Sequence, residues 1–337
     1  AHEKPDAMML FTDPRFFLEQ FAQDDEIHQV CPIVYNHLWD NPPWPEFNRV
    51  LYEATDLINC INKPTYDFCK ERFPEKTNFI PHAVPQEIFF PMKKEEILKQ
   101  KRIILKGKPD DEFVGIWVNR NARRKMPGDV LDSWKQFLDE LEKKHGHRKA
   151  TLIMHTDPLD NEGPNLHHIV DLFGLKNNVL FSKDRFDFAQ MNVLYNISDF
   201  VISRSCAEGF GLSLLEGMMS GTPLIALKTG GMTHQVVDHR DGSENGIALE
   251  PEVKSLVGSQ LVPYIYEDHI SNKTVAEAIL KMYEFGPEKR SELGKKALSY
   301  ARSEFDIKKL ISEWDRTLEE TMNKFKTEYK SWSITQL

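Results

Sequence analysis

The sequence predicts an α/β protein with parallel sheets, and three observations support this fold class. Short apolar runs alternate with amphipathic stretches, as strands and helices do where each helix connects two parallel strands. Residues 199–203 form such a run, and the glycines that follow it lead directly into a helical stretch at 212–219. The length of 337 residues is too great for one ordinary domain and fits two. We therefore expect two α/β units, each with its own core.

The first unit is predicted to be an incomplete doubly wound domain at residues 1–90. Its segment has room for about half of such a domain and contains no glycine-rich first turn. Because the chain opens on Ala1 and reaches an apolar strand within a few residues, we expect the front part of the domain to be missing. The strands are expected at 7–11, 32–35, 56–61 and 78–80.

The second unit is predicted to be a complete doubly wound domain at residues 91–305. Three prolines within 81–91, where the hydrophobic periodicity is lost, indicate the boundary near residue 90. A last segment, 306–337, is predicted to be helical, with an apolar face through Trp314 that needs a partner. The strands of the second unit are expected at 113–118, 150–155, 178–181, 199–203, 224–227 and 247–249, and helices without strands between them at 275–285, 287–305 and 308–332.

The composition excludes several classes of partner. A net charge of −9 argues against nonspecific binding to nucleic acid or to an anionic membrane surface. No apolar run reaches the roughly 18 residues of a transmembrane segment, and the first residues lack the features of a signal peptide, so a cytoplasmic location is expected. The cysteines show no paired metal-ligand spacing and are predicted to be buried or free thiols; they are Cys31, Cys60, Cys69 and Cys206.

Two carboxylates flank a Gly-Phe-Gly turn within 208–216, which is the strongest indication of a functional site. Glu208 lies directly before the turn, and Glu216 lies on the helix after it. Where a parallel strand passes to a helix, free backbone N–H groups and the helix dipole favour an anion, most often phosphate. A wholly helical segment would place the two carboxylates about 12 Å apart, which roughly suits a sugar–diphosphate–ribose ligand. The alternative is that both glutamates are simply solvated.

A cluster of cations follows the first strand of the second unit. Arg120, Arg123, Arg124 and Lys125 all fall within seven residues, 119–125. The carboxyl edge of an open parallel sheet lines the ligand crevice, and both arginine and lysine bind phosphate oxygens there. Arg120 and Lys125 are predicted on this basis to bind phosphate. A solvated surface loop is the alternative.

Together these motifs resemble the retaining group 1 glycosyltransferases of the GT-B superfamily, which include sucrose, glycogen and mannosyl transferases. The resemblance covers roughly residues 5–330. It implies the GT-B fold, in which two Rossmann-like doubly wound domains face a cleft, and a C-terminal helix that crosses back to the N-terminal domain. The residues that carry it are 208–216, Gly221-Thr222-Pro223, Arg120 with Lys125, and Thr229-Gly230-Gly231.

The resemblance also implies roles at the donor site. Glu208 would contact the donor sugar and Glu216 the ribose. Arg120 and Lys125 would hold the diphosphate and stabilise the departing nucleotide, because breaking the sugar–phosphate bond builds negative charge there. Contacts to the same nucleotide, most of them through backbone amides, are implied for Gly209, Phe210, Gly211, Leu212, Gly230 and Gly231.

Other segments are less determined. His37 matches a position at which relatives face the donor sugar across the cleft, but a packed histidine is an equal alternative. The loop 39–44 either shapes an acceptor site with its aromatic faces or is only a rigid loop. His234 replaces the glutamate that is usual in the family, so that contact is not carried over. The segment 250–271 is longer than the family norm and suggests an oligomer contact or a pocket wall.

The expected activity is transfer of a hexose from a nucleotide-diphosphate sugar to an unidentified carbohydrate, lipid or protein acceptor, with retention of configuration. No metal ion or other cofactor is expected, because no metal-binding carboxylate cluster is found in the sequence and the family is usually metal-independent. A nucleotide-sugar epimerase of the same architecture and a noncatalytic nucleotide-sugar-binding protein remain as alternatives. The donor base, the donor sugar and a homo-oligomeric state are left open.

Overall fold

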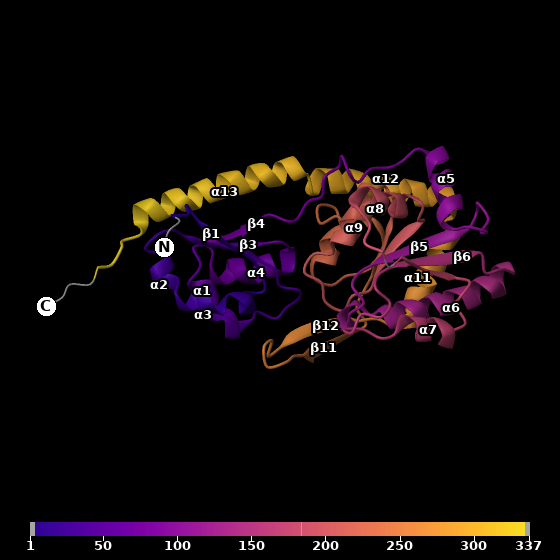
Figure 1. The fold of residues 1–337 in the computed structure, drawn as a ribbon, viewed down its shortest axis with the longest axis horizontal. Coiled ribbons are helices and arrows are strands. Elements are labelled where there is room, and N and C mark those ends of the chain that lie inside the picture. The colour runs from indigo at the N-terminus through magenta and orange to yellow at the C-terminus, as the bar shows by residue number, and fades with distance from the viewer. Residues whose placement is uncertain (1–3, 183, 334–337) are drawn as a thin grey trace.

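The computed structural model describes residues 4–182 and 184–333, which form two halves built on separate parallel sheets (Figure 1). The first sheet has the strand order β1-β2-β3-β4, and a buried apolar cluster that includes Ile33, Tyr52 and Ile58 forms its core. Its strands are β1 (Met8–Thr12), β2 (Ile33–His37), β3 (Leu57–Cys60) and β4 (Thr77–Phe79).

The second sheet has the strand order β10-β9-β8-β5-β6-β7, and its strands pair in parallel throughout. The chain proceeds from β5 to one edge of the sheet and then returns to build the other edge from β8. The order therefore reverses between β5 and β8, and in open α/β sheets such a reversal opens a ligand crevice at the carboxyl ends of the strands. The strands are β5 (Phe113–Val118), β6 (Ala150–His155), β7 (Val179–Ser182), β8 (Phe200–Ser203), β9 (Leu224–Leu227) and β10 (Gly246–Leu249).

Helices connect these strands and cover both sheets. In the first half they are α1 (Leu18–Ala22), α2 (Asp24–Ile27), α3 (Arg49–Glu53) and α4 (Lys63–Arg72), with 3-10 turns η1 (Pro14–Phe17) and η2 (Glu46–Asn48). In the remainder of the chain they are α5 (Lys94–Ile104), α6 (Pro127–His145), α7 (Leu166–Leu172), α8 (Phe188–Asn196), α9 (Leu212–Met219), α10 (Thr233–Val236), α11 (Asn272–Glu284), α12 (Gly286–Glu304) and α13 (Ile307–Glu328), with 3-10 turns η3 (Arg123–Lys125) and η4 (Gly230–Met232).

The last helix, α13, leaves the second half and runs along the first (Figure 1). Asn78 Nδ2 donates a hydrogen bond of 3.1 Å to Thr317 Oγ1, and the ring of His28 stacks on Phe325 and Tyr329. The end of the chain thus packs against residues close to its beginning. Within the described residues, no helix combines the length and the apolar character needed to cross a bilayer.

An antiparallel hairpin, β11 (Val253–Val257) with β12 (Ile265–His269), was not predicted from the sequence. β11 is largely exposed and mixes polar with apolar residues, so it lacks the apolar run by which the other strands were recognised. The hairpin projects from the second half toward the first (Figure 1), where Tyr266 N donates a hydrogen bond of 2.9 Å to Pro42 O. It contributes to the wall of the cavity described below, which was one of the two alternatives for this segment.

Candidate functional site

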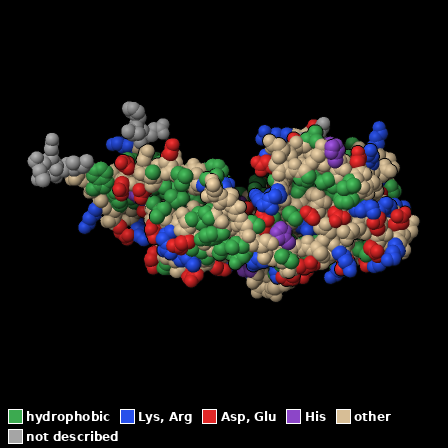
Figure 2. Space-filling model, turned by 90° about the horizontal axis from the view of Figure 1, so that it is seen from below, with side chains coloured by type: hydrophobic (Ala, Val, Ile, Leu, Met, Phe, Trp, Pro, Cys, Tyr) green, Lys and Arg blue, Asp and Glu red, His purple; other side chains and the backbone are tan. Residues whose placement is uncertain are grey.

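A cavity of about 910 Å³ lies between the two halves. The space-filling view shows the surface hollowed there, with basic and acidic side chains beside the hollow (Figure 2). The loops that follow β5 and β8 line one side, and the loops that follow β1, β2 and β4 line the other. The hairpin closes a third side. The cavity therefore lies at the point where the strand order of the second sheet reverses.

The loop after β8 presents the first-turn amides of α9 to this cavity. Gly211 has a φ of +91°, a left-handed conformation that glycine adopts without strain, and it begins α9 without a side-chain cap. The amides of the first helical turn have no intrahelical acceptor, and the helix dipole adds partial positive charge at this end. Leu212 and Ser213 of this turn line the cavity. The geometry suits an anion.

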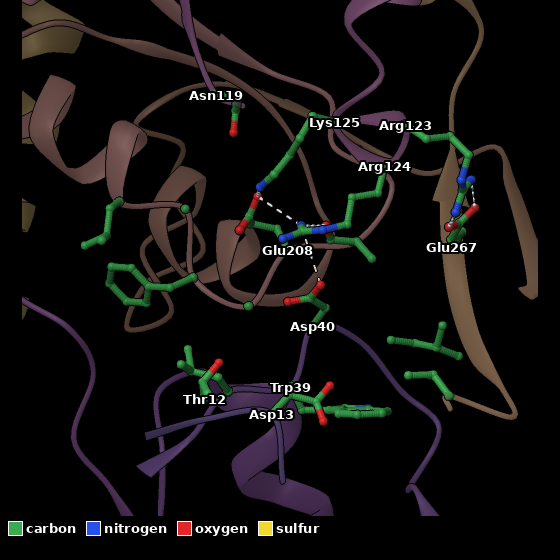
Figure 3. Close-up of a pocket in the computed structure, with 18 of the residues that line it drawn as sticks. Thr12, Asp13, Trp39, Asp40, Asn119, Arg123, Arg124, Lys125, Glu208 and Glu267 are labelled. Carbon is green, nitrogen blue, oxygen red and sulfur yellow. Dashed lines mark hydrogen bonds and ion pairs between the residues drawn. The ribbon is translucent and has the colours of Figure 1, made fainter. Parts of the chain in front are cut away.

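The loop after β5 brings two cations to Glu208. Lys125 Nζ donates a hydrogen bond to Glu208 Oε2, and the two side chains are only 10% and 11% exposed. Arg124 Nη1 lies 3.7 Å from the same carboxylate and 3.5 Å from Asp40 Oδ2 of the first half. Figure 3 shows Glu208 with Lys125 on one side and Arg124 on the other, and Asp40 approaching Arg124. The two cations and the two carboxylates therefore form a network of opposite charges.

Arg120 does not line the cavity. Its guanidinium forms a bidentate pair with Asp160 at 2.7 and 3.1 Å, and its side chain is 57% exposed. The next residue, Asn121, is buried and donates a hydrogen bond of 2.8 Å to Pro164 O, which fixes the loop so that Arg120 points away. The structure therefore brings Lys125 but not Arg120 to Glu208, and Arg124 occupies the place for which Arg120 was predicted.

His37 also lies away from the cavity. It is fully buried in the core of the first half, and its Nε2 lies 2.8 Å from the hydroxyl of Tyr52. Among the described residues, the histidine that lines the cavity is His82, in the segment after β4, which packs edge-on against Phe210. Burial lowers the pKa of His82 to about 4, so its imidazole is neutral near pH 7. No pattern around His82 had indicated this position.

Some of the other predicted residues line the cavity, and the rest pack behind its wall. Glu216 lines the cavity and accepts a hydrogen bond of 2.6 Å from the hydroxyl of Tyr195. Burial raises the pKa of Glu216, and the bond from Tyr195 opposes this in part. The four residues of the turn and the start of α9 that were predicted to bind the nucleotide line the cavity as well; they are Gly209, Phe210, Gly211 and Leu212.

Gly230 and Gly231 lie behind this wall instead. The amide of Gly231 donates a hydrogen bond of 2.9 Å to Glu208 O. A Cβ atom at Gly230 would lie 2.1 Å from that carbonyl oxygen and 2.2 Å from Asp40 O. The two glycines therefore allow close packing behind the Glu208 loop and do not line the cavity.

Asp40 and the hairpin are features of the site that the sequence did not assign. Burial raises the pKa of Asp40, and the nearby charge of Arg124 opposes this. On the hairpin, Glu267 forms a bidentate pair with Arg123 at 3.1 and 2.5 Å, which keeps the pKa of Glu267 low. The only sequence signal near Asp40 was the aromatic loop 39–44, which gave no reason to select its carboxylate.

Two groups of three closely spaced metal-ligating side chains occur within residues 4–182 and 184–333, and both lie outside the cavity. The first is His37 with Cys60 and Cys69. In the second, the buried His234 contacts Glu304 at 3.1 Å and His239 at 2.9 Å. His234 thus takes part in a polar cluster between α10 and α12, away from the cavity.

The family described as Glycosyl transferases group 1 matches residues 99–299, which is more than half of the chain. The chain belongs to the group 1 glycosyltransferases. It is 31% identical over 172 residues to a D-inositol 3-phosphate glycosyltransferase of Stackebrandtia nassauensis, a match that spans 50% of this chain and 37% of the relative. It is 22% identical over 257 residues to the N-acetyl-alpha-D-glucosaminyl L-malate synthase of Bacillus anthracis, across 69% of this chain and 61% of the relative. The chain therefore spans less than two thirds of the length of these relatives.

Solved structures share the fold of this group 1 glycosyltransferase. HepE of Anabaena, in complex with UDP and glucose, superimposes with a TM-score of 0.70 at 18% identity over 93% of this chain and 78% of that one. A sucrose-phosphate synthase of Thermosynechococcus elongatus gives a TM-score of 0.69 at 17% identity, over 94% and 74%. Identities this low show the fold alone. The prediction of a GT-B fold with two Rossmann-like parts is confirmed.

Proposed function

We propose that this chain binds a nucleotide-diphosphate sugar in the cavity and transfers its hexose to an acceptor with retention of configuration and without a metal ion. The observation that carries the proposal is the meeting of Glu208, Lys125 and Arg124 at the first turn of α9. Cations and amides there suit a diphosphate, and a carboxylate beside them suits sugar hydroxyl groups. HepE, which shares the fold, was solved with UDP and glucose, and this supports a donor of the same class.

The mechanism follows from where negative charge develops. Breaking the bond between the sugar and the diphosphate leaves charge on the departing phosphate, and Arg124, Lys125 and the amides of α9 would stabilise it. As the diphosphate takes over these cations, Glu208 becomes free to accept hydrogen bonds from the sugar. Glu216, at the far end of the turn, would accept them from the ribose. Retention would require the acceptor to attack on the face from which the diphosphate leaves, and membership in the family supports this.

The division of the chain remains part of the proposal. We assign residues 1–90 to a partial N-terminal domain on the acceptor side, 91–305 to the nucleotide-sugar domain and 306–337 to a C-terminal segment whose helix, α13, returns to the first. Residues 1–3, 183 and 334–337 of these ranges lie outside the described part of the chain. Two observations support this division: the separate sheets, and the course of α13 along the first half. The wall formed by Trp39 and Asp40 would then meet the acceptor.

A thermal-shift panel of nucleoside diphosphates and their sugars tests donor binding, because a ligand that prefers the folded state raises its apparent stability. We expect at least one of them to stabilise the chain. A charge-assisted hydrogen bond contributes about 1.5–3 kcal/mol, so Arg124→Ala is expected to weaken binding by roughly 10- to 150-fold. The matched variant Arg120→Ala removes the same charge outside the cavity and is expected to bind as the unsubstituted chain does. Stabilisation by no nucleotide would overturn the proposal.

A labelled donor then separates this activity from its rivals. Transfer of the label to an added acceptor supports a glycosyltransferase. A changed sugar on an intact nucleotide would instead identify an epimerase. Nucleotide binding without turnover of any donor, unaffected by replacement of Glu208, would identify a noncatalytic binding protein. Equal activity after treatment with a mild chelator, which leaves a buried structural ion in place, is expected if no metal ion takes part in transfer.

A further inference from the structure

We propose that His37, Cys60 and Cys69 form a structural metal site in the core of the first half. The ligands suit a thiophilic ion, and their total charge favours Zn²⁺. The cavity does not include these side chains, so the proposal does not depend on the proposed transferase activity. The three residues lie far apart in the sequence and come from β2, β3 and α4. His37 and Cys60 are direct neighbours on adjacent parallel strands, and Cys69 lies on the helix that follows β3.

The distances among the ligand atoms suit one metal ion. Cys60 Sγ lies 3.6 Å and Cys69 Sγ 3.9 Å from His37 Nδ1, and all three atoms lie within 4.8 Å of one another. Zinc binds sulfur at about 2.3 Å and imidazole nitrogen at about 2.0–2.1 Å, so tetrahedral ligands of these two types are roughly 3.6 Å apart. A single ion could therefore reach all three atoms after only small side-chain movements.

The second nitrogen of His37 has a partner that orients the ring. Its Nε2 lies 2.8 Å from the Tyr52 hydroxyl oxygen. When Nε2–H donates to that oxygen, the lone pair of Nδ1 faces the two sulfur atoms. Histidines that bind metal ions commonly donate their other ring N–H in this way, which fixes both the tautomer and the ring plane.

The charge of the site favours zinc. A neutral imidazole and two thiolates carry a charge of −2, which Zn²⁺ cancels, and an electrically neutral site suits three side chains that are all fully buried. Cu⁺ also prefers thiolates but would leave a net negative charge in the core. The buried hydroxyl of Thr65 neighbours the Cys60 thiol and is a protein group that could complete a fourth position.

An ion at this place would stiffen the wall of the cavity. Asp40 follows His37 by three residues, and Asn62 follows Cys60 by two. Asn62 Nδ2 donates hydrogen bonds of 3.0 Å to Trp39 O and 2.8 Å to Gly209 O, so it joins the first half to the Glu208 loop. The metal ion would hold β2, β3 and α4 together directly behind these contacts.

Metal analysis of the purified full chain tests the proposal. The chain is produced in medium supplemented with Zn²⁺, treated with a mild chelator, and analysed by elemental mass spectrometry. We expect about one zinc ion per chain, reduced to near zero in Cys60→Ser and in Cys69→Ser. The matched controls Cys31→Ser and Cys206→Ser replace the other two buried free cysteines, which lie outside the cluster, and are expected to retain the ion. His239→Ala is also expected to retain it, which separates this site from the His234 cluster.

Cobalt substitution provides a measurement that does not require the variants to fold. Chain produced with Co²⁺ is expected to show the intense near-ultraviolet charge-transfer absorption of cobalt–thiolate bonds, which histidine and carboxylate ligands alone do not produce. A chain without metal and without this absorption would overturn the proposal, as would a disulfide between Cys60 and Cys69 found by mass spectrometry. Copper in place of zinc would overturn the assignment of the ion as Zn²⁺.

Discussion

Replacing Gly231 by alanine distinguishes a glycine that supports the Glu208 loop from one that contacts the nucleotide. A Cβ atom at this position would lie 2.4 Å from Gly209 O and 2.6 Å from Phe210 Cα. Both are backbone atoms, and neither can move away as the end of a flexible side chain could. The loop therefore has to shift, and the hydrogen bond from Gly231 N to Glu208 O has to lengthen with it.

The cost follows from the depth of this overlap. Overpacking of a tightly packed interior typically costs about 1–3 kcal/mol. In a cooperative unit of about 150–250 residues, each kcal/mol shifts Tm by roughly 2–4 °C. We therefore expect Gly231→Ala to lower the ligand-free Tm of the second half by about 2–12 °C and to weaken nucleotide stabilisation as well.

Differential scanning fluorimetry with and without nucleotide gives both quantities. Gly128→Ala, in α6, is the matched control, because its Cβ would lie at an ordinary 3.4 Å from Ile169 Cδ1 of α7. The Tm of this variant is expected to stay within a few degrees or rise. An unchanged ligand-free Tm for Gly231→Ala together with lost nucleotide stabilisation would refute the reasoning, since it would show that Gly231 contacts the ligand directly.

Three further variants probe contacts at the cavity and beneath α13. Asn62→Ala removes two buried hydrogen bonds and the N-cap of α4, so its free energy of unfolding in urea should fall by about 2–4 kcal/mol. The control Asn165→Ala removes only the N-cap of α7 and should lose about 1 kcal/mol. Burial lowers the pKa of His82 to about 4, so the folded chain resists the protonation that the unfolded chain accepts below about pH 6.5. The free energy of unfolding should therefore fall by roughly 3 kcal/mol between pH 6.5 and pH 4 in urea titrations. In His82→Gln this fall should be smaller. The hydrogen bond to Asp56 raises the pKa of His28 in the folded chain. This contact therefore contributes its full stabilisation below about pH 6.5, and the contribution is lost as the pH rises through the folded pKa. The free energy of unfolding of His28→Phe, measured in urea, should not show this loss.

Local sequence was sufficient to predict most of the fold. The strands at 113–118, 150–155 and 224–227 and the helix at 212–219 have the predicted bounds, because each is a short apolar run that ends at turn residues. The hairpin at 253–269 could not be predicted in this way, because its strands are held by pairing with each other and by contacts with both halves, and they have no apolar pattern of their own.

The carboxylates and the cations of the candidate site also differ in how far the local sequence determines their positions. Glu208 and Glu216 belong to one strand–turn–helix unit, whose local geometry fixes where both carboxylates point, and both line the cavity. Lys125 lies in the segment after β5, where the sequence predicted Arg120 as the accompanying arginine, whereas the structure brings Arg124 to Glu208. That choice depends on the burial of Asn121, which pairs with a segment about forty residues away.

Periodicity in the sequence was enough to predict the alternating strands and helices of an α/β protein and the carboxylate turn of the candidate donor site. The GT-B fold and the glycosyltransferase family were expected from the resemblance of short motifs, whose residues lie close together in the chain. Which side chains meet could be seen only in the folded chain. It placed Arg124 and Asp40 from opposite halves beside Glu208, and it moved His37 from the cleft into a core with two cysteines. Such contacts join residues that are distant in sequence, and only the packing of the two halves and of their cores sets the distances between them.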